Sequence, residues 1–274
     1  MNIKRWFVKK ILKVNKRVVV HLTFKGVIGN IGPRKGGICF ENYQELIKKA
    51  FETKHVKAVC IAINSPGGSP VQSELIYKYI LKLKREKNVP VWMFIEDIAA
   101  SGGYYLACAG DRIYTANNAI IGSIGVISSG FGFTELIKKI GIERRVYTQG
   151  ENKSILDPFL PEKQEDINML KEMQQDVHKN FMAIVKTSRD KKLKDNKDLF
   201  SGKIWSGMQA IENGLADEIG FFEEVAEQQF GKKVKIIKLE PKKSKLLSKL
   251  GLDIVLDNLA IKIREHIIWS KYEL

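Results

Sequence analysis

The chain has 274 residues, of which 44% are hydrophobic and 28% are charged. These values are close to globular averages, so they exclude a disordered or low-complexity chain and leave enough apolar material for a buried core. At roughly 100–200 residues per domain, the length allows one large domain or two small ones.

The formal net charge of +15 is concentrated at the two ends of the chain. Residues 1–40 hold ten Lys/Arg and no acidic residue, and residues 232–274 hold eleven Lys/Arg against five acidic residues. The ends therefore carry +10 and +6, which leaves −1 for the body. A nucleic-acid-binding domain usually carries its positive charge on a folded face. Basic ends fit an anionic membrane surface at least as well, so we expect that partner and no nucleic acid.

Residues 3–14 begin the chain with apolar side chains at helical spacing and lysines between them. This pattern indicates either a short basic amphipathic helix or a frayed, solvated end. Because lysines interrupt every apolar run, the pattern predicts neither a signal peptide nor a membrane-spanning segment. We therefore expect a cytoplasmic protein, peripheral on the inner face of the cell membrane.

From residue 17 the chain alternates between apolar runs and amphipathic stretches. The apolar runs predict strands at 18–24, 56–63, 89–95, 112–115, 120–127 and 145–148. Helical periodicity covers about 41–53, 70–86, 162–189 and 206–213. Strands that alternate with helices indicate βαβ units around a parallel sheet, and continuous apolar strands indicate that helices cover both faces.

The body contains no linker long enough to divide it. We therefore predict three parts: a basic amphipathic N-terminal segment (1–16), one large domain (17–240) and a basic helical tail (241–274). The tail has an apolar stripe, which suits packing between subunits or contact with a membrane equally well.

Two glycine-rich turns follow neighbouring predicted strands, at residues 64–68 (Asn-Ser-Pro-Gly-Gly) and 99–105 (Ala-Ala-Ser-Gly-Gly-Tyr-Tyr). A strand–glycine–helix turn presents backbone N–H groups that can hold an oxyanion, and a serine there can act as a nucleophile. Taken alone, the first turn is more simply a plain turn, and Ser101 is equally well a helix N-cap. Two such turns at adjacent strand ends would lie together, which favours catalysis.

A serine nucleophile needs a base. The histidines lie in a strand, at a helix end, in the long helix and in the tail, not beside either turn: His21, His55, His178 and His266. A Ser-His-Asp triad is therefore poorly supported. A lysine can serve if burial and nearby positive charge lower its pKa, and Lys153 lies in a suggestive loop. The three cysteines have no regular spacing and predict neither disulfides nor a metal site.

Five motifs in order resemble the signal peptide peptidase A (SppA) family. They lie at residues 64–68, 100–105, 122–126, 153–159 and 210–220. The resemblance covers about residues 18–231, so the domain at 17–240 would be SppA-like. It implies an α/β fold of the ClpP/crotonase superfamily, with repeated ββα units and peripheral helices. It also implies a serine endopeptidase that uses neither a cofactor nor a metal.

The resemblance assigns roles to single residues. Ser101 would be the nucleophile and Lys153 the general base of a Ser-Lys dyad. The two turns would supply the oxyanion hole from the N–H groups of Gly68 and Gly102, and substrate contacts from Gly67 and Ser65. In a single-copy chain, Lys153 would come from a neighbouring subunit, which implies a homo-oligomer with a shared site. The substrates would be peptides, such as cleaved signal peptides or membrane-protein fragments.

Two other functions compete with this hypothesis. A crotonase-like acyl-CoA enzyme would use the same oxyanion geometry, but it needs no Ser-Lys pair and normally uses carboxylates. A catalytically silent, membrane-associated scaffold of the same fold would not need the intact Ser101, Lys153 and glycine turns. Many members of the resembled family also carry an N-terminal membrane anchor, where this chain has only its basic stretch.

Overall fold

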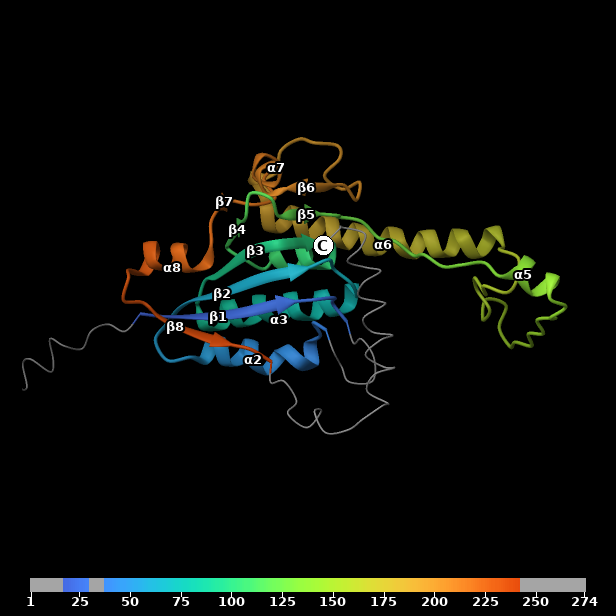
Figure 1. The fold of residues 1–274 in the computed structure, drawn as a ribbon, viewed down its shortest axis with the longest axis horizontal. Helices are drawn as coiled ribbons and strands as arrows, with labels where there is room; N and C mark the ends of the chain where they lie inside the picture. The colour runs from blue at the N-terminus through green and yellow to red at the C-terminus, as the bar shows by residue number, and fades with distance from the viewer. Residues whose placement is uncertain (1–16, 30–36, 242–274) are drawn as a thin grey trace, which may run out of the picture. The chain divides into compact units, whose positions relative to one another are not determined.

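The computed structural model describes residues 17–29 and 37–241 (Figure 1). The predicted N-terminal amphipathic helix and nearly all of the predicted basic tail lie outside these residues, so both stay predictions. Within the described residues, no helix is long and apolar enough to cross a membrane.

An eight-stranded sheet forms the centre of the described structure. Its strands are β1 (Val18–Lys25), β2 (Val56–Ser65), β3 (Val91–Ala100), β4 (Arg112–Thr115), β5 (Ile120–Gly122), β6 (Ile204–Ser206), β7 (Glu218–Ile219) and β8 (Lys235–Leu239). The order is β6-β5-β3-β2-β1-β8, and β4 pairs with both β3 and β7. Every pairing is parallel except that of β5 with β6. The predicted parallel sheet is therefore confirmed at its centre.

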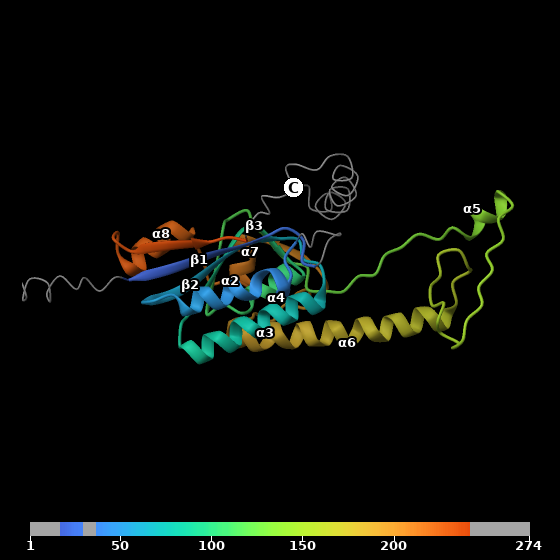
Figure 2. The ribbon, with the colours of Figure 1, turned by 90° about the horizontal axis from the view of Figure 1, so that it is seen from below.

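Helices cover both faces of this sheet, as the continuous apolar strands predict (Figure 2). On one face lie α2 (Phe40–Glu52), α3 (Pro70–Lys87) and α4 (Gly102–Ala107). On the other face, α8 (Phe222–Phe230) packs on a cluster that includes Val19, Cys60 and Phe94. The remaining helices are α5 (Thr134–Lys139), α6 (Gln164–Arg189), the 3-10 turn Asp190–Lys192 and α7 (Gly207–Glu212).

Three strand predictions need correction. The strand predicted at 145–148 is absent: these residues are mostly exposed, and Arg145 pairs with Glu143 instead of a neighbouring strand. The predicted strand at 120–127 ends at Gly122, where the backbone turns with φ 109°. Conversely, β3 does not stop at Ile95 but continues to Ala100.

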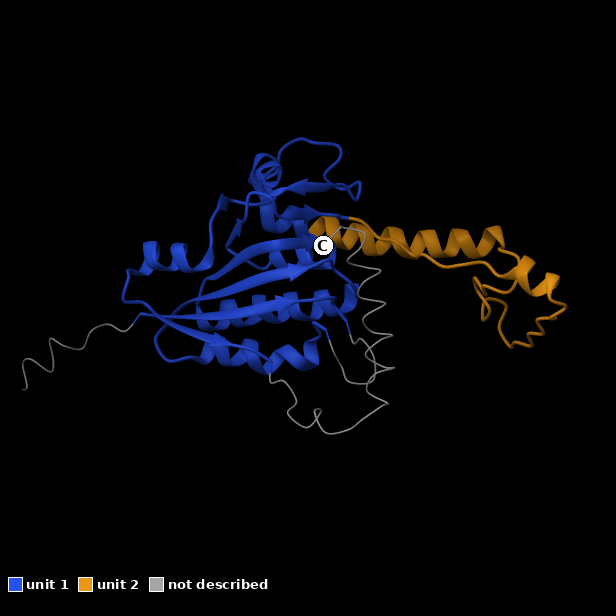
Figure 3. Ribbon diagram, viewed as in Figure 1, with its two compact units in different colours: residues 1–124, 184–274 blue, residues 125–183 orange. Residues whose placement is uncertain are grey.

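The chain divides into two compact units (Figure 3). Unit 1 comprises residues 1–124 and 184–274 and contains the whole sheet; unit 2 comprises residues 125–183. The prediction of one domain over 17–240 stays a prediction, with these two units inside it. In unit 2, helix α5 buries none of its residues. The sequence pattern does not reveal unit 2, because its apolar residues have ordinary helical and strand-like spacing.

Candidate active site

The first glycine-rich turn joins β2 to α3. Gly67 and Gly68 have φ values of 104° and 141°, which side chains other than hydrogen rarely allow. The buried Ser65 hydroxyl accepts a hydrogen bond from the Gly67 N–H at 3.2 Å. Ser69 then caps α3, because its hydroxyl accepts from the Gln72 N–H at 3.4 Å. Hydrogen bonds from backbone N–H groups to the hydroxyls of Ser65 and Ser69 therefore hold the turn, and the Ser65 hydroxyl faces the backbone of Gly67.

The second turn places Ser101 between β3 and α4. Its backbone has φ 51° and ψ −121°, a strained conformation for a residue with a side chain. Ser101 is the N-cap residue of α4, yet its hydroxyl makes no capping hydrogen bond, so the N-cap explanation of this serine fails. The Ser101 N–H donates to the Gly122 carbonyl at 2.8 Å, and the side chain is partly exposed. Strain at a strand–helix turn is how α/β enzymes expose a nucleophile.

The two turns touch, as expected for adjacent parallel strands. A Cβ atom on Gly67 would lie 2.8 Å from the Ser101 Cβ and 2.9 Å from the Ala100 carbonyl oxygen. A Cβ atom on Gly102 would lie 3.4 Å from the Gly68 nitrogen. Real Cβ atoms do not approach backbone as closely as 2.9 Å, so only glycine at position 67 lets the first turn reach Ser101.

The N–H groups of Gly68 and Gly102 have no hydrogen-bond acceptor within the described part of the chain. Gly102 opens α4, so its N–H is one of the first-turn donors that a helix leaves unpaired. The first turn is held from the other side, because Ser69 N–H donates to the Ile28 carbonyl and Ile28 N–H to the Gly67 carbonyl, each at 2.8 Å. Two unpaired donors therefore lie close together beside the Ser101 turn.

Lys153 belongs to unit 2, whereas Ser101 belongs to unit 1. Its side chain is exposed, and its N–H donates to the Gly150 carbonyl at 3.2 Å in a turn. The loop that carries it is held by the Asp157–Arg144 ion pair at 2.9 Å and by the Leu156 N–H, which donates to Asp166 at 3.1 Å.

The two histidines that the structure describes in unit 1, His21 and His55, lie away from the Ser101 turn, as predicted. His55 directly precedes β2, so it lies at the opposite edge of the parallel sheet from the residues that follow β3. The His21 ring packs in a tilted orientation against Phe222, with ring centroids 4.2 Å apart, and burial, together with the charge of Lys238, lowers the pKa of His21. His178 lies in α6 within unit 2, and His266 lies outside the described residues.

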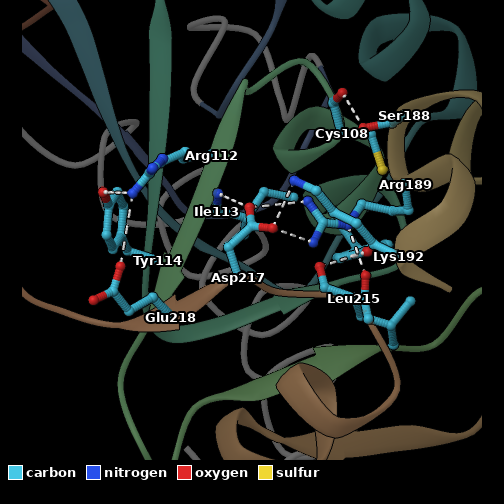
Figure 4. Close-up of polar contacts among 12 residues, drawn as sticks. Cys108, Arg112, Ile113, Tyr114, Ser188, Arg189, Lys192, Leu215, Asp217 and Glu218 are labelled. Atoms are coloured by element: carbon cyan, nitrogen blue, oxygen red, sulfur yellow. Dashed lines mark hydrogen bonds and ion pairs between the residues drawn. The ribbon is translucent and has the colours of Figure 1, made fainter. Parts of the chain in front are cut away.

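A polar cluster anchors the helix that Ser101 begins (Figure 4). The Tyr104 hydroxyl donates to the Leu215 carbonyl at 2.8 Å, and the Ser188 hydroxyl donates to the Cys108 carbonyl at 2.7 Å. Arg189, only 1% exposed, donates to the Gly214 carbonyl and forms a two-bond pair with the Asp217 carboxylate. The motif at 210–220 therefore supports α4 from within unit 1.

Sequence reasoning missed one residue beside the site, Asp97. Its carboxylate accepts a hydrogen bond from the Asn64 side-chain amide, the first residue of the 64–68 motif. The available signal is the charged pair Glu96-Asp97 between Ile95 and Ile98 in an otherwise apolar strand.

Comparison with known proteins agrees with this geometry. The model of peptidase family S49 matches residues 83–235, more than half of the chain. A protein of Brucella abortus named Na(+)/H(+) antiporter NhaA is 47% identical over 243 residues, which are 84% of this chain but 33% of that protein. The chloroplastic serine protease SPPA of Arabidopsis thaliana is 32% identical over 71% of this chain and 28% of its own length. The chain thus spans about a third of the length of these curated relatives.

Solved structures of the membrane-bound stomatin-specific protease 1510-N have the same fold. A serine-to-alanine variant aligns with a TM-score of 0.51 and 18% identity, over 83% of this chain and 99% of that one. A lysine-to-alanine variant in complex with a substrate peptide aligns with a TM-score of 0.51 and 16% identity, over 89% and 98%. The fold is therefore the ClpP/crotonase-like α/β fold, as predicted. Given the family match, this chain belongs to peptidase family S49.

Proposed function

We propose that this chain is a serine endopeptidase in which Ser101 is the nucleophile. The observation that carries the proposal is the strained Ser101 turn, whose hydroxyl is free of the capping bond. A purely structural N-cap would use that hydroxyl and would relieve the backbone strain. The substituted residue types of the two 1510-N structures, serine and lysine, support a Ser-Lys pair.

The N–H groups of Gly68 and Gly102 form the oxyanion hole in this proposal. When the Ser101 hydroxyl attacks a peptide carbonyl, negative charge develops on the carbonyl oxygen. Two donors that are already oriented and unpaired stabilise that charge without reorganising, and removal of one such donor typically costs about 100- to 1,000-fold in rate. Gly67 and Ser65 would then border the substrate. Ser65 would do so indirectly, because its hydroxyl accepts the hydrogen bond from Gly67 N–H that holds the turn.

Lys153 is the general base of the proposed reaction. Neutral Lys153 takes the proton from Ser101 as the Oγ–carbonyl bond forms, and then gives it to the amine as the peptide bond breaks. Water then attacks the resulting acyl-enzyme ester and gives a proton to Lys153, which passes it to the Ser101 Oγ as the ester bond breaks and the acid product leaves. Lysine is ordinarily protonated at neutral pH, so the base needs a desolvated position beside Ser101.

We further infer that a neighbouring subunit supplies this lysine. Lys153 is exposed in the single chain. Unit 2, which carries it, exposes large apolar side chains that a single chain leaves in water, among them Phe131 at 79% and Tyr147 at 91% exposure. The others are Ile127, Leu136, Ile140, Ile142, Ile155, Phe159, Met169 and Met173. Exposed apolar side chains on this scale mark an interaction surface, and a second copy of the chain would bury them and desolvate the lysine.

The proposed substrates are peptides, such as cleaved signal peptides or membrane-protein fragments. The proposed place of action is the cytoplasm, peripheral on the inner face of the membrane. The basic ends support an anionic membrane surface as a partner, because clustered Lys/Arg bind acidic lipids.

Labelling with a fluorophosphonate probe tests the proposal directly. We expect wild-type protein to be labelled covalently and to hydrolyse casein or a leader peptide. The Ser101→Ala variant should lose both activities and keep its melting temperature, because the change removes only the reacting oxygen. The Ser129→Ala variant is the matched control and should behave as wild type. Undiminished proteolysis by Ser101→Ala would overturn the proposal and favour a different nucleophile, while an unlabelled, inactive wild type would favour the acyl-CoA enzyme or the silent scaffold.

A further inference from the structure

Two polar side chains meet beside the glycine-rich turns. The Asn64 side-chain amide, at the end of β2, donates a hydrogen bond to the Asp97 carboxylate of β3. Asn64 is 4% exposed and directly precedes Ser65, whereas Asp97 is exposed and lies four residues before Ser101. One residue of the pair therefore leads into each turn of the candidate site.

The pair lies where the regular ladder between β2 and β3 breaks. Ile63 pairs with Ile95, but Ser65 pairs with Ala99, so β3 uses four residues where β2 uses two. In a regular ladder Ser65 would stand opposite Asp97. The nucleophile turn would then be displaced by two residues, about 6.6 Å of strand, from the turn that carries Gly67 and Gly68. The two extra residues of β3 thus determine that Ser101 meets these glycines.

An irregular stretch of strand loses ladder hydrogen bonds and needs another contact to hold its shape. The Asn64–Asp97 bond crosses this stretch and has one ionised partner, which makes such bonds stronger than neutral ones. As a contact for stability alone it is poor, because the Asn64 Oδ1 atom is buried and has no hydrogen-bond partner in the described structure.

The charged groups around the pair do not replace this bond. Lys25 stands opposite Asn64 in the register of β1 and β2, and Glu96 is next to Asp97 in β3. Burial and the Asp97 charge raise the pKa of Glu96, and Lys25 opposes that shift. The side-chain contact between the two strands at this point is the hydrogen bond from the Asn64 amide to the Asp97 carboxylate.

We propose that Asn64 and Asp97 are a positioning pair, whose hydrogen bond holds the irregular part of β3 so that Ser101 faces the N–H groups of Gly68 and Gly102. This inference rests on the proposed peptidase function. The pair acts through the backbone and touches neither the substrate nor the reacting atoms.

The test breaks the bond from each side in the full chain. Asn64→Leu replaces the amide with an apolar side chain of similar size, and Asp97→Ala removes the acceptor from an exposed position. Asp97→Asn keeps an acceptor oxygen but removes the charge. The readouts are the maximal rate of fluorophosphonate labelling and the probe concentration at half that rate, together with the melting temperature. Asn196→Ala, which breaks the Asn196–Asn213 bond elsewhere in unit 1, is the matched control.

We expect Asn64→Leu and Asp97→Ala each to lower the maximal labelling rate by about 10- to 100-fold, the scale for a misplacement near 1 Å. The half-saturating probe concentration should stay within twofold of wild type. The double variant should lose no more than either single variant, because both remove one bond. Asp97→Asn should recover most of the rate, and Asn196→Ala should label as wild type.

Three outcomes would overturn the inference while leaving the peptidase proposal intact. In the first, wild type is labelled and the single variants are labelled at the same rate. In the second, the double variant loses as much labelling rate as the two single variants together. In the third, Asp97→Asn is labelled as slowly as Asp97→Ala. If the labelling rate falls only in proportion to the melting temperature, and Asn196→Ala shows the same proportion, the pair is merely a stabilising contact. A wild type that no probe labels would contradict the peptidase proposal and this inference with it.

Discussion

At the scale of single residues, the candidate site depends on glycine where a side chain has no room. Gly67 has φ 104°, and a Cβ atom there would collide with Ser101 and Ala100. In the Gly67→Ala variant we expect a loss of about 1–3 kcal/mol in stability from the backbone strain. The collision should also move Ser101 and slow labelling by at least about tenfold.

Gly202→Ala is the matched control for Gly67→Ala. Gly202 also has a positive φ, 86°, but nothing lies within 4 Å of its Cβ position. The Gly202→Ala variant should therefore be less stable than wild type but be labelled at the wild-type rate. Equal labelling rates for the two variants, measured with their melting temperatures, would contradict the close approach of the turns.

Asp217 makes a second prediction at the residue scale. Burial alone would raise its pKa, but the hydrogen bonds from Arg189 and Lys192 outweigh burial and lower it to about 2. A lowered folded-state pKa means that the carboxylate contributes stability above its ordinary value of 3.8, and that this contribution is lost as the pH falls towards about 2. The shift corresponds to about 2 kcal/mol.

In the Asp217→Asn variant we expect the free energy of unfolding at pH 7 to fall by about 3 kcal/mol, because buried Arg189 loses its charged partner. The free energy of unfolding of the variant should also lack the fall that the Asp217 carboxylate causes between pH 4 and 2. Asp198→Asn, which breaks the exposed pair with Lys203, should cost no more than about 1 kcal/mol. Denaturant unfolding at several pH values measures both, and equal curves for wild type and Asp217→Asn would refute the assignment.

At the scale of elements, α7 begins with a complete capping box. The Ser206 hydroxyl accepts from the Gln209 N–H at 3.3 Å, and the Gln209 side chain accepts from the Ser206 N–H at 3.1 Å. This box satisfies two backbone donors of a six-residue helix. We expect Ser206→Ala to lower the free energy of unfolding by about 1 kcal/mol.

Thermal unfolding of Ser206→Ala beside Ser129→Ala checks this value. Ser129 is exposed and makes no side-chain hydrogen bond within the described residues, so its replacement should cost nothing measurable. If the two serine variants melt alike, the box does not hold the start of α7.

At the scale of the whole molecule, the proposed mechanism predicts that assembly of subunits brings Lys153 to Ser101. Ser101→Ala and Lys153→Ala should each be inactive. Mixed oligomers of the two should recover part of the activity, because some sites would combine an intact Ser101 with an intact Lys153 from a neighbour. Lys153→Arg should also be inactive, since a guanidinium does not lose its proton in this pH range.

Co-expression with two affinity tags isolates the mixed oligomers, and peptide hydrolysis measures the recovery. Mixed oligomers without recovery would place both residues in one subunit. A Phe131→Asp variant, which puts a charge among the exposed apolar side chains of unit 2, should weaken assembly in sedimentation velocity and lower hydrolysis in parallel. Assembly that is unchanged by this substitution would rule out Phe131 as part of the contact.

Local sequence was enough to predict the central strands, four of the helices and the two glycine-rich turns, and to single out Ser101 as a candidate. The parallel centre of the sheet, helices α2, α3, α6 and α7, and the two turns all follow from apolar periodicity and from glycines at strand ends. These patterns depend on residues a few positions apart, so they can be recognised in the sequence without knowledge of the fold. The strained backbone of Ser101 agrees with the role that the Ala-Ala-Ser-Gly-Gly pattern predicts.

Contacts between distant residues could not be predicted in this way. The charges of Glu96 and Asp97 indicate the end of a strand, yet β3 continues to Ala100, because its last residues pair with β5, a strand farther along the chain. Arg189 is one of 46 Lys/Arg in the sequence, and it becomes buried only because Asp217, far along the chain, neutralises it. The sequence by itself thus determined the central strands and the helices beside them, and it pointed to Ser101 as the candidate nucleophile. Only the tertiary structure decided the register of β3 and the anchoring of α4, because long-range polar pairing leaves no periodic pattern in the chain.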